Sequence, residues 1–174
     1  MVRLLLGTLS SFVITFSAAI AQDVRITPDT SSYTIELNGQ QITIGRIQDP
    51  NNTITPEFTK TSRPCPPFCI HPISAAAGVE AVGELEVIDF LEKSVAAGNG
   101  LLVDSRVPEW FAKGTIPGAV NVPFSTLEPS NSYRDQIVQA LGATKAGAGW
   151  DFPRAFDLTL FCNGPWCDQS PRAI

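Results

Sequence analysis

Apolar and polar residues alternate along residues 33–46, and this period of two is typical of a β-strand with one buried face. Tyr33, Ile35 and Leu37 share one face of the first run. Asn38–Gly39 separates this run from the second, and this residue pair accepts the positive φ angles of a tight turn. The pattern therefore predicts a β-hairpin.

From Gly83 onward the apolar spacing lengthens to that of amphipathic helices, and two helices are predicted, over 83–98 and 132–143. Their inward-facing residues are Leu85, Ile88 and Leu91 in the first helix and Ile137, Val138 and Leu141 in the second. Two short apolar runs, 100–104 and 156–161, are typical of buried parallel strands. Helices that alternate with such strands predict an α/β domain built on a parallel sheet flanked by helices.

The second of these strands runs directly into Cys162, and a helix is predicted to begin shortly after Cys167. Asp168 and Ser170 are residue types that cap helices, and Pro171 suits a first helical turn. Ligands of open α/β sheets bind at the carboxyl ends of the strands. Cys162 lies at such an end, so it is the first candidate for chemistry.

The composition excludes some classes of function. The chain has 174 residues, of which 44% are hydrophobic, and this fraction supports a folded core rather than a disordered chain. The formal net charge is -5, and the sequence has no basic patch of the kind that binds nucleic acid. No nucleic-acid partner is therefore expected.

The N-terminus has the pattern of an export signal. Arg3 gives a positive start, residues 4–20 are uncharged, and Ala19-Ile20-Ala21 fits the small-x-small cleavage pattern. We place cleavage after Ala21 and expect an exported, periplasmic protein with no membrane attachment after cleavage; a retained anchor is the alternative. The predicted organisation is a signal peptide at 1–21, a hairpin and Cys/Pro-rich extension at 22–82, and the α/β domain at 83–174.

The four cysteines form two close pairs, Cys65 with Cys69 and Cys162 with Cys167. Because close pairs can be oxidised outside the cytoplasm, Cys65 and Cys69 are expected to form a disulfide or a redox pair. A zinc site is not expected, because His71 is the only histidine and two thiols plus one imidazole leave the ion short of a ligand. No metal or other cofactor is predicted.

Two stretches resemble the signatures of rhodanese-type sulfurtransferases. The stretch "LLVDSRVPEWFAKGTIPGAVNVP" is similar to the first signature, and "LTLFCNGPWCDQS" is similar to the active loop, with Cys162 in the place of the catalytic cysteine. The first signature is matched by Asp104, Arg106, Glu109, Trp110, Gly114, Ile116, Pro117, Gly118 and Ala119. The lead-in "TSRPCPPFCIHP" resembles an exported subset of rhodanese-like proteins. The likeness covers roughly residue 83 to the end of the chain.

The resemblance implies a mechanism of sulfur transfer. Cys162 would take the outer sulfur of thiosulfate or a similar donor as a persulfide and pass it to a thiol or to cyanide. A ring of backbone N–H groups would stabilise the charged sulfur. Pro165 has no N–H, so the donors that would hold the substrate are those of Asn163, Gly164, Trp166, Cys167 and Asp168. Asp104 and Arg106 are expected to be a structural pair beside the loop.

Some positions depart from the family pattern. Thr115 stands where the family often has histidine, Cys167 stands where the loop usually has Arg, Ser or Thr, and the loop is about two residues longer. A longer loop is similar to that of the related phosphatases, but Asp168 replaces their arginine and would repel phosphate. Because rhodanese domains continue beyond this helix, the sequence is expected to be a C-terminally truncated fragment with an incomplete sheet.

Two questions stay open at this point. Cys167 is a resolving thiol, a disulfide partner of Cys162, or a residue that only fills the loop. The alternative to a sulfurtransferase is a thiol-disulfide redox or sulfur-binding protein on the same scaffold, since fold alone does not determine function.

Overall fold

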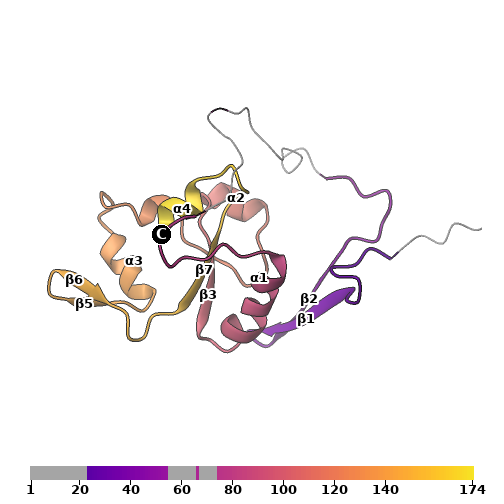
Figure 1. Ribbon diagram of the computed structural model, residues 1–174, viewed down its shortest axis with the longest axis horizontal. Helices are drawn as coiled ribbons and strands as arrows, with labels where there is room; N and C mark the ends of the chain where they lie inside the picture. Colours follow the sequence, from indigo (N-terminus) through magenta and orange to yellow (C-terminus); the bar gives the residue numbers. More distant parts are fainter. Residues whose placement is uncertain (1–22, 55–65, 67–73) are drawn as a thin grey trace, which may run out of the picture.

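The computed structural model describes residues 23–54, 66 and 74–174 of the chain (Figure 1). The predicted signal peptide and the Cys65–Cys69 pair lie outside the described residues. Within the described part, helices and short strands alternate from Gly83 onward, as the sequence pattern predicts.

A parallel three-stranded sheet forms the centre of the molecule, with the strand order β4-β3-β7. Strand β3 (Gly100–Asp104) pairs in parallel with β4 (Val120–Asn121) on one side and β7 (Asp157–Phe161) on the other. Asp104 lies beside Phe161 in this register, so the ends of β3 and β7 lie next to each other. The parallel sheet flanked by helices confirms the predicted fold class.

The helices are short. Helix α1 (Glu84–Phe90) continues into a π-helical turn, η2 (Leu91–Val95), and α2 (Pro108–Lys113) follows β3. A 3₁₀ turn, η3 (Phe124–Thr126), and helix α3 (Arg134–Ala140) connect β4 to the rest of the chain. Helix α4 (Gln169–Ala173) begins directly after Asp168, where the capping residues predict a helix start.

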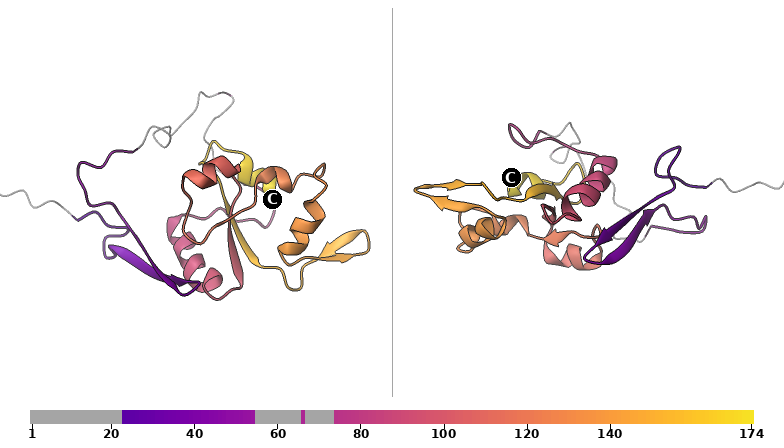
Figure 2. Two further views of the ribbon diagram at one scale, coloured as in Figure 1. Left: turned by 180° about the vertical axis from the view of Figure 1, so that it is seen from behind. Right: turned by 90° about the horizontal axis from the view of Figure 1, so that it is seen from below.

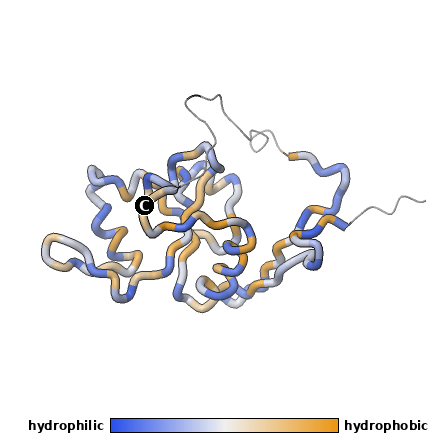
Figure 3. Tube along the Cα trace, in the orientation of Figure 1, coloured by the Kyte–Doolittle hydropathy of each residue, from blue (hydrophilic) through white to orange (hydrophobic). Residues whose placement is uncertain are grey.

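The predicted hairpin is present as β1 (Ser32–Leu37) and β2 (Gln40–Gly45), paired antiparallel. Asn38 has φ 53° and Gly39 has φ 75°, so both turn residues adopt the positive angles that Asn-Gly accepts. Hydrophobic and hydrophilic residues alternate along this hairpin in Figure 3.

The hairpin shares a core with the sheet domain. Ile35 is 3% exposed and Leu37 is 5% exposed, and they pack in one cluster with Ile88, Leu91 and Leu102. A Cβ atom on Gly118 would lie 2.6 Å from Leu37 Cδ1, so the hairpin sits directly against the Ile-Pro-Gly-Ala turn. The Arg46 guanidinium also donates two hydrogen bonds to Glu84, at 2.7 and 2.6 Å.

Two details of burial differ from the sequence prediction. Leu85 is 46% exposed, because α1 begins at Glu84 and the core begins one turn later at Ile88. Strand β7 is not fully buried, and Leu158 is 42% exposed, because β3 is the only strand that pairs with β7 among the described residues. Burial depends on neighbours from distant parts of the chain, which the local pattern does not reveal.

A second hairpin, β5 (Thr144–Ala146) and β6 (Gly149–Asp151), was not predicted. Its strands have three residues each, which is too short for an alternating pattern to be recognised. The two hairpins lie at opposite ends of the molecule (Figures 1 and 2).

Candidate active site

The end of β3 carries a buried ion pair. Asp104 is 0% exposed and Arg106 is 6% exposed. The Arg106 side chain donates to both carboxylate oxygens of Asp104, at 2.8 Å from Nε and 2.6 Å from Nη2. The Thr115 hydroxyl donates to the same carboxylate at 2.8 Å. Burial raises the pKa of Asp104, but the hydrogen bonds from Arg106 and Thr115 outweigh it, so the pKa is lowered overall.

Arg106 connects this pair to the cysteine loop. Its Nη1 donates to the side-chain oxygen of Asn163 at 3.5 Å, and its Nη2 donates to the carbonyl of Gly114 at 2.7 Å. The guanidinium also lies over the ring of Phe161, 5.8 Å from the ring centroid. One buried cation therefore contacts the last residue of β7, the first residue after Cys162 and the turn that follows α2.

The thiol of Cys162 is half-buried at the end of β7. The hydroxyl of Ser170 donates to Cys162 Sγ at 3.3 Å. Hydrogen bonding from the Cys167 thiol is the largest cause that lowers the pKa of Cys162; burial opposes it, and the Ser170 hydroxyl and the amides of Ser170 and Gly164 add to it. The pKa of Cys162 is lowered to about 5, so this sulfur is a thiolate at neutral pH.

Cys167 lies in the same loop, and its pKa is shifted in the opposite direction to that of Cys162. Its thiol donates to the Cys162 sulfur, and this hydrogen bond, together with burial, raises the pKa of Cys167. The amides of Gln169 and Asn163 face its sulfur and work in the other direction. Neither cysteine is part of a disulfide, and the loop holds a thiolate at Cys162 beside a thiol at Cys167.

The loop itself is a tight turn. The amide of Cys167 donates to the carbonyl of Gly164 at 2.9 Å and closes it. Gly164 has φ 133°, and a Cβ atom there would lie 2.9 Å from the ring of Trp166. A larger residue at this position would be strained and would also displace Trp166.

The loop residues that the sequence predicts to hold the substrate therefore make different contacts. Gly164 and Cys167 contact the Cys162 sulfur, Asn163 contacts Arg106, and Trp166 packs on Gly164. The side chain of Asp168 is 77% exposed and lies 3.9 Å from Arg172. Ser170 was missed as a contact of the sulfur, because a hydroxyl eight residues after a cysteine reaches it only once the loop is folded.

Helix α4 is held in place by Arg172. Its guanidinium forms an ion pair with Glu128 and lies over the ring of Phe124, 4.3 Å from the centroid. These contacts attach α4 to η3 and so fix Ser170 beside the thiolate.

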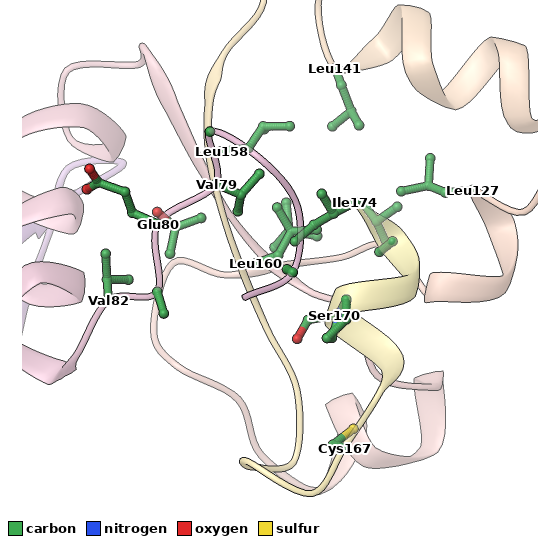
Figure 4. Close-up of a pocket in the computed structure, with 18 of the residues that line it drawn as sticks. Val79, Glu80, Val82, Leu127, Leu141, Leu158, Leu160, Cys167, Ser170 and Ile174 are labelled. Atoms are coloured by element: carbon green, nitrogen blue, oxygen red, sulfur yellow. The ribbon is translucent and has the colours of Figure 1, made fainter. Parts of the chain in front are cut away.

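A cavity of about 700 Å³ adjoins the loop (Figure 4). Its apolar lining includes Val79, Val82, Leu158, Leu160 and Ile174. Cys167 and Ser170 line it as well, whereas Cys162 does not. The second thiol therefore borders a space that the first does not reach.

No group of three or more His, Cys, Asp or Glu side chains that could hold a metal ion exists among the residues with a described structure. No helix in that part of the chain is long and apolar enough to cross a membrane.

A thiolate at the carboxyl end of a parallel strand, enclosed by a loop of backbone amides, defines a protein built for thiol-based group transfer. The model of the rhodanese-like domain family matches residues 87–173, which is half of the chain. The chain therefore belongs to the rhodanese-like domain family, and membership supports sulfurtransferase activity in general.

A curated relative agrees with this assignment. The chain is 43% identical over 51 residues to the human (Homo sapiens) thiosulfate:glutathione sulfurtransferase. The aligned part covers 29% of this chain and 44% of the human protein, so the chain spans less than half the length of that relative. No solved structure matches the chain.

Proposed function

We propose that the protein is an exported sulfurtransferase that carries sulfane sulfur on Cys162. The sulfur comes from thiosulfate or a similar donor and passes to a thiol or to cyanide. The observation that supports this most strongly is the state of Cys162: a half-buried thiolate at the end of β7, hydrogen-bonded by the Ser170 hydroxyl at 3.3 Å. A persulfide carrier needs a sulfur that is both nucleophilic and reachable, and Cys162 meets both needs.

The two half-reactions balance without a cofactor. In the first, the Cys162 thiolate attacks the outer sulfur of thiosulfate, the S–S bond of thiosulfate breaks, and sulfite leaves with the electron pair. In the second, cyanide or a thiolate attacks the outer sulfur of the persulfide and the Cys162 thiolate is the leaving group. The loop amides and the Ser170 hydroxyl stabilise the negative charge at both stages.

Asp104 and Arg106 are assigned a positioning role. They bond chiefly to each other and to the loop around them, and they are too buried to meet a substrate from solvent. Within the pair, it is the Arg106 side chain that contacts the loop, by donating to the side-chain oxygen of Asn163, and it also lies over the ring of Phe161 at the end of β7.

The activity test uses the chain with Cys65 and Cys69 both replaced by Ser, so that only the loop thiols remain. This background protein is expected to transfer sulfur from thiosulfate to cyanide and to gain one sulfur atom by intact mass spectrometry. Cys162→Ser in this background should abolish both. A Cys162→Ser protein that still gains sulfur at Cys167 would move the nucleophile to the other cysteine.

We also propose that the protein is exported and that Cys65 and Cys69 form a disulfide. The charged and apolar start of the chain and its Ala-x-Ala motif support cleavage after Ala21. N-terminal sequencing of the secreted protein should begin at Gln22, and an intact Met1 on a membrane-bound product would contradict this. Alkylation of the exported protein before and after reduction should show Cys65 and Cys69 oxidised; two free thiols there would exclude the disulfide.

A further inference from the structure

The second thiol of the loop helps to keep Cys162 ionised, but it carries no sulfur in the transfer reaction above. Cys167 nevertheless lies against Cys162, in a turn that its own amide closes onto the Gly164 carbonyl at 2.9 Å. Both thiols are free, and Cys167 borders the 700 Å³ cavity. A hydroxyl can donate a hydrogen bond to the Cys162 sulfur, as Ser170 does, so the role of a donor does not by itself account for a second sulfur atom beside Cys162.

We propose that Cys167 resolves the Cys162 persulfide, releasing the carried sulfur as hydrosulfide and closing a Cys162–Cys167 disulfide. This inference rests on the proposed function, because it acts on the persulfide that sulfur transfer produces. It adds a second outcome for the carried sulfur: transfer to an acceptor when one is present, and release as hydrosulfide when none arrives.

The step balances within the protein. The Cys167 sulfur attacks Cys162 Sγ and forms the new S–S bond. The bond between Cys162 Sγ and the outer sulfur breaks, and the electron pair goes to the outer sulfur. The proton of the Cys167 thiol passes to that sulfur, which leaves as HS⁻. In this step the Cys167 sulfur is oxidised and the carried sulfur is reduced, while the Cys162 sulfur keeps the oxidation state that it gained on loading. No external oxidant is needed.

The surroundings of Cys167 favour this step after Cys162 has been loaded. In the free loop, the negative charge on Cys162 holds the proton on Cys167. In the persulfide, the charge moves out to the terminal sulfur, and Cys162 Sγ becomes a neutral target. The amides of Gln169 and Asn163 then face the Cys167 sulfur and stabilise the charge that develops as it loses its proton.

The cavity gives a reducing thiol access to the Cys162–Cys167 disulfide, so that both loop thiols can be restored. Two equivalents of a small thiol reduce the disulfide, giving back both loop thiols and one external disulfide. Cys167 lines the cavity and Cys162 does not, so the reducing thiol attacks the Cys167 sulfur from this side.

The experiment is a single turnover without an acceptor and without oxygen. The Cys65→Ser/Cys69→Ser protein is mixed with one equivalent of thiosulfate, beside the same protein carrying Cys167→Ser or Cys167→Ala. Sulfite reports loading, hydrosulfide reports resolution, and intact mass identifies persulfide or disulfide. The protein with Cys167 should release sulfite and then an equal amount of hydrosulfide, and should end two hydrogen atoms lighter.

Both Cys167 variants should release sulfite and keep the added sulfur, with hydrosulfide release at least about tenfold slower, because the attacking sulfur is missing. Equal persulfide lifetimes with and without Cys167 would overturn the inference. A second arm loads Cys162 with inorganic polysulfide. Absence of sulfite in the first arm, with Cys167-dependent hydrosulfide release in the second, would remove thiosulfate as the donor and leave the inference standing. Persistent persulfide in both arms overturns it.

Discussion

Strands β3 and β7 are neighbours and end at the same edge of the sheet, yet their ends are built in opposite ways. The end of β3 is buried, and its two charges are paired with each other through two hydrogen bonds. The end of β7 is half-exposed, and the charge on Cys162 is balanced by a thiol, a hydroxyl and amides rather than by a cation in direct contact. The paired charges of Asp104 and Arg106 hold the surrounding backbone in place, whereas the charge on Cys162, which is stabilised only by dipoles, stays available for reaction.

Arg106 couples the two ends. It satisfies Asp104 and at the same time donates to Asn163, the residue that follows Cys162. The β7 end, which carries Cys162, can therefore remain partly exposed because the adjacent β3 end is rigid. Changes to the β3 end should act first on stability, and changes to the β7 end should act first on thiolate chemistry.

The largest effect is expected from Asp104→Ala. This change leaves the Arg106 cation buried without its partner, which costs about 3–5 kcal/mol of unfolding free energy. Urea unfolding followed by circular dichroism measures the loss. Glu36→Ala, which removes an exposed carboxylate from β1, is the matched control and should stay within about 0.5 kcal/mol of wild type. A loss at Asp104 no larger than that of the control would contradict the rigid role of the β3 end.

The pH dependence of the same measurement sharpens this result. The pKa of Asp104 is lowered in the folded protein, so its contribution to stability is present above the unfolded pKa of about 4 and is lost as the pH falls through the folded value. Wild-type stability should therefore decline in acid more steeply than that of Asp104→Ala.

An intermediate effect is expected from Arg106→Lys. Lysine keeps the charge but cannot form the paired contacts to Asp104 and the contact to Asn163 together. We expect a loss of about 1–3 kcal/mol in stability and about tenfold in the rate of sulfur transfer, since the loop loses its anchor. Lys113→Arg, the reverse exchange at the exposed end of α2, is the control. Full activity in a destabilised Arg106→Lys protein would show that the two strand ends are independent.

The sequence predicted much of this arrangement and missed its central contact. The hairpin, the parallel strands and the helix after Asp168 follow from local signals, such as the Asn38–Gly39 turn and the apolar runs. The contact between Ser170 and Cys162 does not, because it depends on how the loop folds and on how Arg172 fixes α4 against η3. The exposure of Leu158 was missed for the same reason: it reflects what lies beside the strand.

The smallest effect on stability is expected from Ser170→Ala, which probes the β7 end alone. The hydroxyl stabilises the Cys162 thiolate, and a hydrogen bond to a charged group of about 1.5 kcal/mol corresponds to roughly one pKa unit. The pKa of Cys162 should therefore rise from about 5, while the unfolding free energy changes by less than about 1 kcal/mol.

The rate of alkylation of Cys162 by iodoacetamide between pH 4 and pH 8, measured in the background that lacks Cys65 and Cys69, reports this pKa. The variant should react more slowly than the parent near pH 5, where fewer of its sulfurs are ionised, and equally fast near pH 8, where both are thiolates. Ser125→Ala, at an exposed position of η3, should overlay the parent profile. If Ser170→Ala overlays it too, the hydroxyl is not what holds the charge, and the thiol of Cys167 and the loop amides carry that role.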